Sequence, residues 1–341
     1  MIRRSHNMIN RTFILSAVFL FQASLQAQNA AADLPTSNLL SQPGPTFTIP
    51  DSQLAASVSF IAYGDMRFTD PKNLTATNPR IRKWLVEKIA SEHPAAVFLN
   101  GDVPLAGYVL NDYAVFHDES APWRAAGLRI YPALGNHEFH GPDPQQCLQN
   151  WWNAFPDFRN RRWYSVALGS RIYAINLDSD ASLLPDGEQY KWLNQQLQNL
   201  PAKVDFVLIS LHHPPVADIQ KHIEVDHNPR PNEIAIRDLF SETARHIHAR
   251  IIVSAGHIHN YERHNLNDVV YLVSGGGGAK PYYVERTPDD LYQSDLFPNF
   301  NYVKFSLRDD RLEAVMYRVA DPEAATLEVT AKDKFEILVK R

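Results

Sequence analysis

The chain of 341 residues contains almost no cysteine, since Cys147 is the only one. A single cysteine excludes an internal disulfide and any metal site built from several thiolates. The sequence also has no basic excess, because 33 lysines and arginines face 38 aspartates and glutamates, giving a net charge of −5. A negative balance disfavours binding to a nucleic acid backbone, so no such partner is expected.

Apolar runs long enough to span a bilayer comfortably are also missing. The apolar run of residues 13–21 follows three arginines and precedes small residues that end at Ala27. This pattern predicts a secretory signal over residues 1–27, and hence export to the periplasm or the extracellular space. An uncleaved anchor is the alternative; after cleavage no stable membrane span is expected.

Strands alternate with helices along most of the chain. Residues 28–56 contain four prolines and are interpreted as a linker or an N-terminal strap, which leaves residues 57–341 as the folded domain. Apolar runs predict strands, helical periodicity predicts helices, and their alternation predicts an α/β fold. The strands are expected at 58–63, 95–99, 128–134, 163–168, 170–177, 204–211, 251–254, 269–274 and in an antiparallel tail at 302–339; the helices are expected at 79–92, 111–125, 187–200 and 235–249.

Five loops directly after predicted strands are rich in polar residues. In open α/β sheets, ligands bind outside the carboxyl ends of the strands. The preference of Asp, Asn and Gly for turns explains any one such loop but explains five of them poorly. The loops are Gly64-Asp65, Gly101-Asp102, Gly135-Asn136-His137-Glu138, His212-His213-Pro214 and Gly256-His257-Ile258-His259.

The side chains in these loops indicate a metal site. They offer carboxylates, an amide oxygen and imidazoles, but no thiolate. Imidazole favours Fe, Mn or Zn over Ca or Mg. Two such ions a few ångströms apart would clamp the attacking and leaving oxygens of a displacement reaction and lower the pKa of a bound water.

The five motifs, in this order, resemble those of the calcineurin-like metallophosphoesterase superfamily, and residues 256–263 resemble the purple acid phosphatase branch in particular. The resemblance covers about residues 57–320. It implies a four-layer αββα sandwich of two mixed β-sheets flanked by helices. It also implies an enzyme that hydrolyses small phosphate esters, with metal-activated water attacking phosphorus. A phosphomonoesterase is expected; the alternatives are a phosphodiesterase for cyclic nucleotides or lipid head groups, and a non-catalytic metal- or phosphate-binding protein.

The resemblance also assigns roles to single residues. It implies two metal ions, Fe, Mn or Zn, with Asp102 bridging both. His137 is expected to contact the phosphate or to act as general acid toward the leaving oxygen. The first ion would be held by Asp65 and His259, and the second by Asn136, His212 and His257.

Two positions depart from the family pattern. Arg67 stands where most members have a histidine ligand, and Leu105 stands where purple acid phosphatases have a tyrosine ligand. A guanidinium cannot bind metal, so the first ion lacks a usual ligand. The site therefore holds either one ion or two. Arg67 is therefore expected to clamp phosphate, or else to form a structural ion pair. Tyr108 is the nearest candidate for replacing the missing tyrosine.

Several further residues lie beside the motifs. Glu138 is expected to support its loop, and Glu262 and Arg263 are expected to make structural contacts. The four glycines at 275–278 open no clear helix, which argues against a nucleotide site, and the resemblance places them behind the metal centre. Possible pocket residues are His140, Asn176 and His213.

Overall fold

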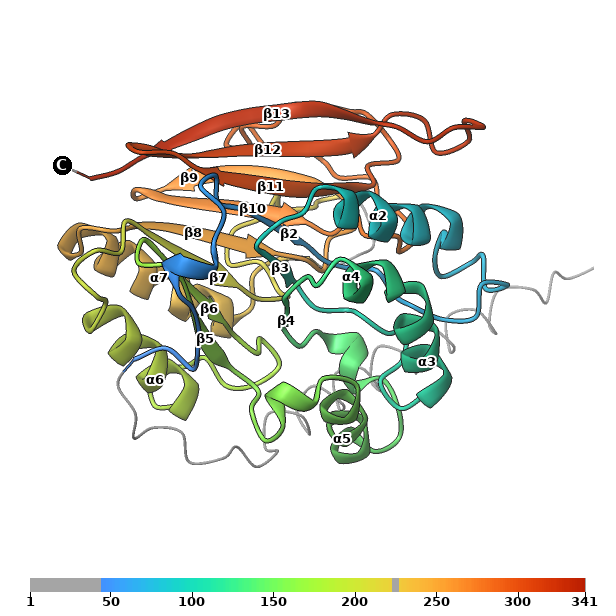
Figure 1. Ribbon diagram of the computed structural model, residues 1–341, viewed down its shortest axis with the longest axis horizontal. Helices are drawn as coiled ribbons and strands as arrows, with labels where there is room; N and C mark the ends of the chain where they lie inside the picture. Colours follow the sequence, from blue (N-terminus) through green and yellow to red (C-terminus); the bar gives the residue numbers. More distant parts are fainter. Residues whose placement is uncertain (1–43, 223–226, 341) are drawn as a thin grey trace, which may run out of the picture.

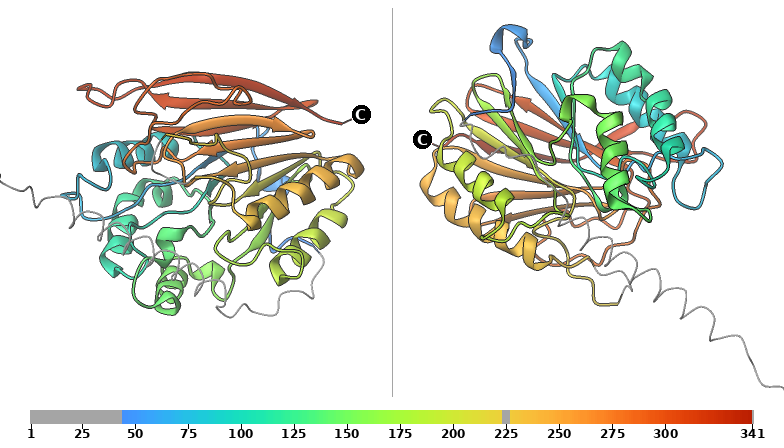
Figure 2. Two further views of the ribbon diagram at one scale, coloured as in Figure 1. Left: turned by 180° about the vertical axis from the view of Figure 1, so that it is seen from behind. Right: turned by 90° about the horizontal axis from the view of Figure 1, so that it is seen from below.

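The computed structural model describes residues 44–222 and 227–340. Two β-sheets lie in the middle of the molecule and helices cover the two outer sides (Figures 1 and 2). This arrangement confirms the predicted α/β sandwich of two mixed sheets flanked by helices. The predicted signal over residues 1–27 lies outside the described residues.

The first sheet has seven strands, most of them parallel to their neighbours. β1 pairs in parallel with β5, although the sequence indicated only a linker or strap in this segment. β9 is the antiparallel edge strand and was also not predicted. In spatial order the strands are β1 (Phe47–Ile49), β5 (Tyr164–Leu168), β6 (Ile172–Asn176), β7 (Phe206–Ser210), β8 (Arg250–Ala255), β10 (Val269–Ser274) and β9 (Tyr261–Leu266).

The second sheet has six strands. Its three N-terminal strands are parallel, and the C-terminal tail adds three antiparallel strands, as the sequence predicted. In spatial order they are β13 (Val329–Leu338), β12 (Arg311–Val319), β11 (Asn301–Leu307), β2 (Ser59–Tyr63), β3 (Ala96–Leu99) and β4 (Ile130–Pro132).

Six α-helices of the described residues flank the sheets. The segment predicted as one helix over 111–125 forms two, because the chain breaks at Ser120 and Pro122 restarts a helix near its first position. No helix among the described residues is both long and apolar enough to cross a membrane. The helices are α2 (Pro79–Ser91), α3 (Leu110–Glu119), α4 (Ala121–Ala125), α5 (Pro144–Ala154), α6 (Glu188–Gln198) and α7 (Pro231–His246).

Two apolar layers hold the sandwich together. Along β8, Ile252 packs into the core between the sheets, whereas Ile251 and Val253 pack against the layer that includes α6 and α7. Because successive strand residues point to opposite faces, a strand buried on both faces is a continuous apolar run. The same reasoning explains why β6, β7 and β8 were recognisable in the sequence. Because β6, β7 and β8 are parallel, their carboxyl ends lie at the same edge of the sheet, and the polar loops begin there.

Candidate metal centre

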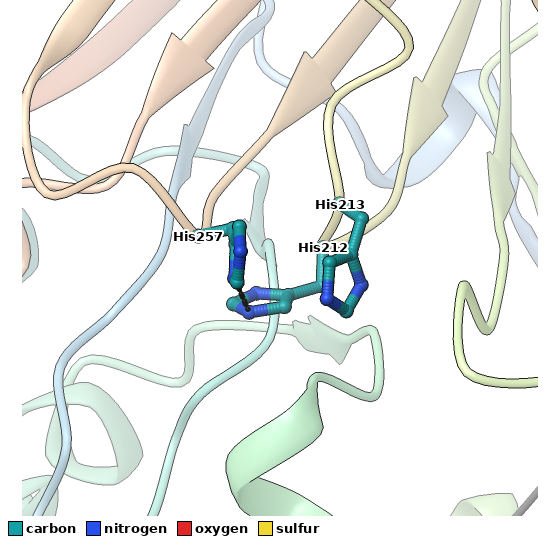
Figure 3. A group of neighbouring side chains, drawn as sticks. All are labelled: His212, His213 and His257. Atoms are coloured by element: carbon teal, nitrogen blue, oxygen red, sulfur yellow. Dashed lines mark hydrogen bonds between the residues drawn. The ribbon is translucent and has the colours of Figure 1, made fainter. Parts of the chain in front are cut away.

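The five polar loops meet at one end of the two sheets. Three of them extend from the six-stranded sheet and two from the seven-stranded sheet, so each sheet supplies part of the site. Figure 3 shows the rings of His212 and His257 in contact, with His213 beside them. The loop residues are Asp65 after β2, Asp102 after β3, Asn136 after β4 at the start of the 3-10 helix Asn136–Phe139, His212 after β7, and His257 and His259 after β8.

Three ligand atoms surround Nε2 of His212. Asn136 Oδ1 lies 2.9 Å from it, Asp102 Oδ1 lies 3.2 Å away, and His257 Nδ1 lies 3.2 Å away. Nδ1 of the same ring is 2.9 Å from the carbonyl oxygen of Asn100, which can only accept a hydrogen bond. The proton of a neutral His212 is therefore on Nδ1, and its Nε2 lone pair faces the three other atoms.

This convergence fits a cation. Asn136 Oδ1 and Asp102 Oδ1 are acceptors, and a proton on His257 Nδ1 would satisfy only one of the contacts around His212. Adjacent ligands about 2.1 Å from one metal ion lie about 3 Å apart, which matches these distances. Ligand atoms of Asp65, Asp102 and His212 also lie within 4.8 Å of one another. The four residues proposed for the second ion thus form a compact site.

Two further ligand atoms face each other nearby. Asp65 Oδ1 and His259 Nε2 are 3.4 Å apart, and within the described residues neither has a hydrogen-bond partner. His259 donates from Nδ1 to the carbonyl oxygen of Lys280 at 2.6 Å, which leaves the Nε2 lone pair free. Burial raises the pKa of Asp65 to about 8, even though His212 opposes the shift. A cation would let this buried carboxylate ionise.

Asp102 lies between the two groups. Burial by itself raises its pKa, but the neighbouring charges of His212, His137 and Arg67 outweigh burial and hold the pKa well below its usual range. Oδ1 of Asp102 faces His212, and Oδ2 faces the opposite side. Arg67 donates to Oδ2, and the bridging of two ions by Asp102 remains a prediction.

Arg67 occupies the side of Asp102 where the family pattern has a further ligand. Its Nη2 and Nε donate to Asp102 Oδ2 at 3.1 and 3.3 Å. The ion pair that the sequence analysis gave as the alternative is therefore present, and a clamp on phosphate remains a prediction. The Arg67 side chain is 13% exposed, so it is not fully enclosed.

His137 is held at both ends. Its backbone N–H donates to Asp102 Oδ1 at 3.0 Å, and its Nδ1 contacts the carbonyl oxygen of Leu105. Nε2 therefore faces the cluster, 3.9 Å from Asp102 Oδ2. Burial lowers the pKa of His137 well below its usual value, and Arg67 adds to this effect. The ring of His140 lies 3.9 Å from that of His137.

Glu138 supports the loop, as expected. Its carboxylate accepts hydrogen bonds from the backbone N–H groups of Asp102, Val103 and Gly135 at 3.0, 2.8 and 2.8 Å. These bonds join the loop after β3 to the loop after β4. The glycines behind the centre are also placed as expected, since a Cβ on Gly275 would lie 2.9 Å from Asp65 Oδ2.

The sequence analysis missed Asn100 and Tyr282. The ring of Tyr282 stacks on that of His259 at 4.0 Å, and burial raises the pKa of its hydroxyl while the nearby charge of Arg67 opposes the shift. Tyr108, the candidate for the missing tyrosine, is 43% exposed instead. No local motif marks Tyr282, because it reaches the centre from a long loop after β10.

His213, one of the expected pocket residues, is held by Ser179, whose Oγ lies 2.8 Å from Nδ1 of the His213 ring.

Residues 64–261, more than half of the chain, match the model of the family described as calcineurin-like phosphoesterase. The chain belongs to this family. The matched segment begins just before Asp65 and ends just after His259, so it includes every candidate ligand. The carboxylate and histidine side chains that cluster in this family segment are of the types that could bind a metal ion.

Solved structures agree on the fold of this phosphoesterase. The purple acid phosphatase PPD1 from yellow lupin (Lupinus luteus) seeds matches with a TM-score of 0.64 at 19% identity, over 85% of this chain and 55% of that one. The structure of PhoD matches with a TM-score of 0.60 at 13% identity, over 87% and 72% of the two chains. Identities this low support the fold and no finer assignment.

A curated relative is similar over a shorter stretch. Acid sphingomyelinase-like phosphodiesterase 3b of the mouse (Mus musculus) is 26% identical over 113 residues, which is 26% of this chain and 25% of that protein. The phosphoesterase thus spans a quarter of this relative and about half of the lupin protein.

Proposed function

We propose that this phosphoesterase is an exported phosphomonoesterase with a centre for two metal ions. The observation that supports the proposal most strongly is the convergence of acceptor atoms on Nε2 of His212, which a bound cation would satisfy. The buried pair of Asp65 Oδ1 and His259 Nε2 supports a second position for an ion. Fe, Mn and Zn all suit this set of imidazole, carboxylate and amide ligands.

Each side chain of the centre has a separate role in this proposal. When bound, the ions supply an activated water and neutralise the charge of the phosphate. Asp102 would hold both ions, and Asn136 and His212 would hold the second. His137 directs Nε2 at the centre, where a bound phosphate would oppose the effect of burial on its pKa and let the protonated ring donate to the leaving oxygen. Arg67, whose side chain is partly exposed, binds a phosphate oxygen with its guanidinium.

A phosphodiesterase is the second candidate function. It is supported by the similarity to the mouse relative, whose name describes a phosphodiesterase. The two activities differ in the substrate's charge and size, since a diester carries one charge fewer and a second organic group. A comparison of kcat/KM for p-nitrophenyl phosphate and bis(p-nitrophenyl) phosphate tests the choice. A higher value for the monoester supports our proposal, and a higher value for the diester overturns it.

The third candidate is a non-catalytic metal- or phosphate-binding protein on the same fold. The replacement of a family histidine by Arg67 is the feature that favours it. Metal analysis combined with a panel of phosphate esters separates this candidate from an enzyme. Bound metal without turnover of any ester would support the binding protein and contradict catalysis.

Export is proposed from the sequence alone, because residues 1–27 have the pattern of a secretory signal. Expression of the full chain in a bacterial host, followed by cell fractionation and N-terminal sequencing, tests it. We expect the mature protein outside the cytoplasm with an N-terminus near residue 28. A full-length chain that stays in the cytoplasm would contradict export.

A further inference from the structure

A second cluster of ligand-type side chains lies apart from the metal centre. Asp218, Glu262 and His264 are all buried, and one ligand atom from each lies within 4.8 Å of the others. Glu262 and His264 are two residues apart on β9, so they share one face of this edge strand. Asp218 comes from the loop that follows β7.

Two carboxylate oxygens in this cluster are buried without a hydrogen-bond partner among the described residues: Asp218 Oδ2 and Glu262 Oε1. The other oxygen of each group is fixed. Glu262 Oε2 accepts from the backbone N–H of Asp218 at 2.7 Å. Asp218 Oδ1 accepts from the backbone N–H and the hydroxyl of Thr287 at 3.0 and 2.6 Å. These bonds orient both carboxylates and leave one oxygen of each available to a ligand.

The nearest positive charge, the guanidinium of Arg286, is already paired with another carboxylate. Nη1 of Arg286 lies 3.7 Å from Asp218 Oδ2, but it donates to Asp290 Oδ2 at 2.7 Å. One guanidinium thus faces the carboxylates of both Asp218 and Asp290. His264 contacts Glu262 through Nε2 at 3.3 Å, which is a long contact for an ion pair. The buried negative charge is therefore only partly balanced.

We propose that Asp218, Glu262 and His264 bind a structural divalent cation, Zn²⁺ or Mn²⁺. Two carboxylates with an imidazole suit these ions better than Ca²⁺ or Mg²⁺, which prefer oxygen ligands alone. Ligands about 2.1 Å from one ion lie at most about 4.2 Å apart, so the three side chains need to close by only about half an ångström. A bound cation would satisfy Asp218 Oδ2 and Glu262 Oε1 together.

This cation connects segments that build the catalytic centre. Asp218 follows His212 along the same loop, and Glu262 follows His259 by three residues. Thr287 belongs to the loop that also carries Tyr282, which stacks on His259. The cation therefore holds these three segments in place from outside the centre.

The competing state is a protonated Glu262. Burial raises the pKa of Glu262 to about 7, against the opposing hydrogen bond from His264. A neutral carboxylic acid in this place would need no cation. The two states respond differently to Glu262→Gln, because glutamine imitates the neutral acid but is a poor metal ligand.

Metal analysis of full-length protein, loaded with Zn²⁺ or Mn²⁺ and dialysed, tests the site. We expect Glu262→Gln and His264→Gln each to bind one equivalent of metal less than the unchanged protein. Their melting temperatures should also respond less to added metal. The control Glu233→Gln removes a buried carboxylate that is paired with Arg230, and it should keep the full metal content.

A Glu262→Gln protein with unchanged metal content and melting temperature would overturn the proposal in favour of the neutral acid. If this variant fails to fold, His264→Gln decides the question by the same measurements. His212→Gln separates the site from the catalytic centre: it should lose a catalytic ion and turnover while the equivalent bound through Glu262 remains.

Discussion

Three of the six candidate ligands, and Arg67 beside them, have left-handed backbone angles. Asp65, Asp102 and His257 have φ values of 63°, 54° and 71°, and Arg67 has 47°. Left-handed angles at non-glycine residues cost of order 1 kcal/mol or more and persist only where the surroundings enforce them. Here buried hydrogen bonds enforce them, such as that from the backbone N–H of His257 to Asp65 Oδ2 at 2.9 Å. The free-energy cost of these backbone angles is thus found at side chains that point into the candidate metal centre.

Arg67→Ala tests the phosphate clamp. A charge-assisted hydrogen bond to phosphate contributes about 1.5–3 kcal/mol, so we expect KM for p-nitrophenyl phosphate to rise about tenfold or more. The control Arg245→Ala removes an arginine that is 61% exposed on α7, and it should leave KM unchanged. An unchanged KM in Arg67→Ala, together with a loss of bound metal, would mean that the ion pair with Asp102 is the whole role of Arg67.

Gly135→Ala tests how tightly the ligands are packed. A Cβ at Gly135 would lie 2.5 Å from Asp102 Oδ1 and 2.9 Å from the His212 ring, so these ligands must move apart. We expect weaker metal binding and lower turnover with little loss of secondary structure, measured by metal titration and circular dichroism. Gly127→Ala is the control: its φ of 64° makes the change mildly destabilising, but a Cβ there meets nothing within 4 Å, so metal affinity should stay unchanged. Unchanged metal affinity in Gly135→Ala would contradict the packing described.

At the scale of elements, the centre depends on strand ends. Five strands could be predicted because they are apolar runs that end in polar loops, and their parallel pairing brings the loops to one edge. β1 escaped prediction because it is only three residues long and lies in a proline-rich segment. β9 escaped because its edge position and polar sequence, from Tyr261 to Leu266, resemble a loop.

The candidate ligands could be found from the sequence for the same reason, whereas their neighbours could not. Motifs mark residues at strand ends, and the structure brings those residues together. The surroundings of Arg67 depend on the direction of its side chain toward Asp102 and on the loop that carries Tyr282. The spacing of residues in the sequence predicts neither. The cluster of Asp218, Glu262 and His264 joins residues too far apart in the chain for a motif.

Asn100 connects the two sheets, and its removal should destabilise the fold. Its amide nitrogen donates to Ser254 Oγ at 2.9 Å, and its amide oxygen accepts from Ser210 Oγ at 3.0 Å, all buried. Asn100→Ala leaves these groups unsatisfied, so we expect a loss of about 2–3 kcal/mol in the free energy of unfolding, measured by urea denaturation. Asn153→Ala, an exposed change on α5, should cost far less. Equal stabilities of the two variants would contradict this role.

Glu92 anchors the end of α2 to β11 and gives a pH test. Burial alone would raise its pKa, but hydrogen bonds from Lys304 and Lys88 hold the pKa below its usual value. The folded state therefore binds the proton less readily, so the stabilisation exists above the unfolded pKa of about 4.3 and disappears as pH falls through the folded pKa. We expect Glu92→Gln to cost about 1 kcal/mol at pH 7, with the difference shrinking below about pH 4.

Thermal unfolding of Glu92→Gln and the unchanged protein across this pH range measures the difference. Glu242→Gln is the matched control, since Glu242 is 60% exposed and its ion pairs are screened by solvent. A cost for Glu92→Gln that does not depend on pH would show that packing, and not charge, anchors α2.

At the scale of the whole molecule, metal binding is coupled to the packing of the two sheets. Asp65, Asp102 and Asn136 come from one sheet, and His212, His257 and His259 come from the other. A ligand present at 100 times its dissociation constant stabilises the folded state by about 2.7 kcal/mol. We expect chelation to lower the melting temperature by about 5 °C. Asn136→Ala should show a smaller response, and no change in the unaltered protein would contradict the coupling.

The central claim is that the converging ligands hold catalytic metal. The most direct measurement is the rate of p-nitrophenyl phosphate hydrolysis by metal-depleted protein as Fe²⁺, Mn²⁺ or Zn²⁺ is added back, with bound metal measured in the same samples. We predict that the depleted protein is inactive and that turnover returns in proportion to the metal bound, but not in His212→Gln. Full turnover without metal, or full loading without turnover of any phosphate ester, would contradict the claim.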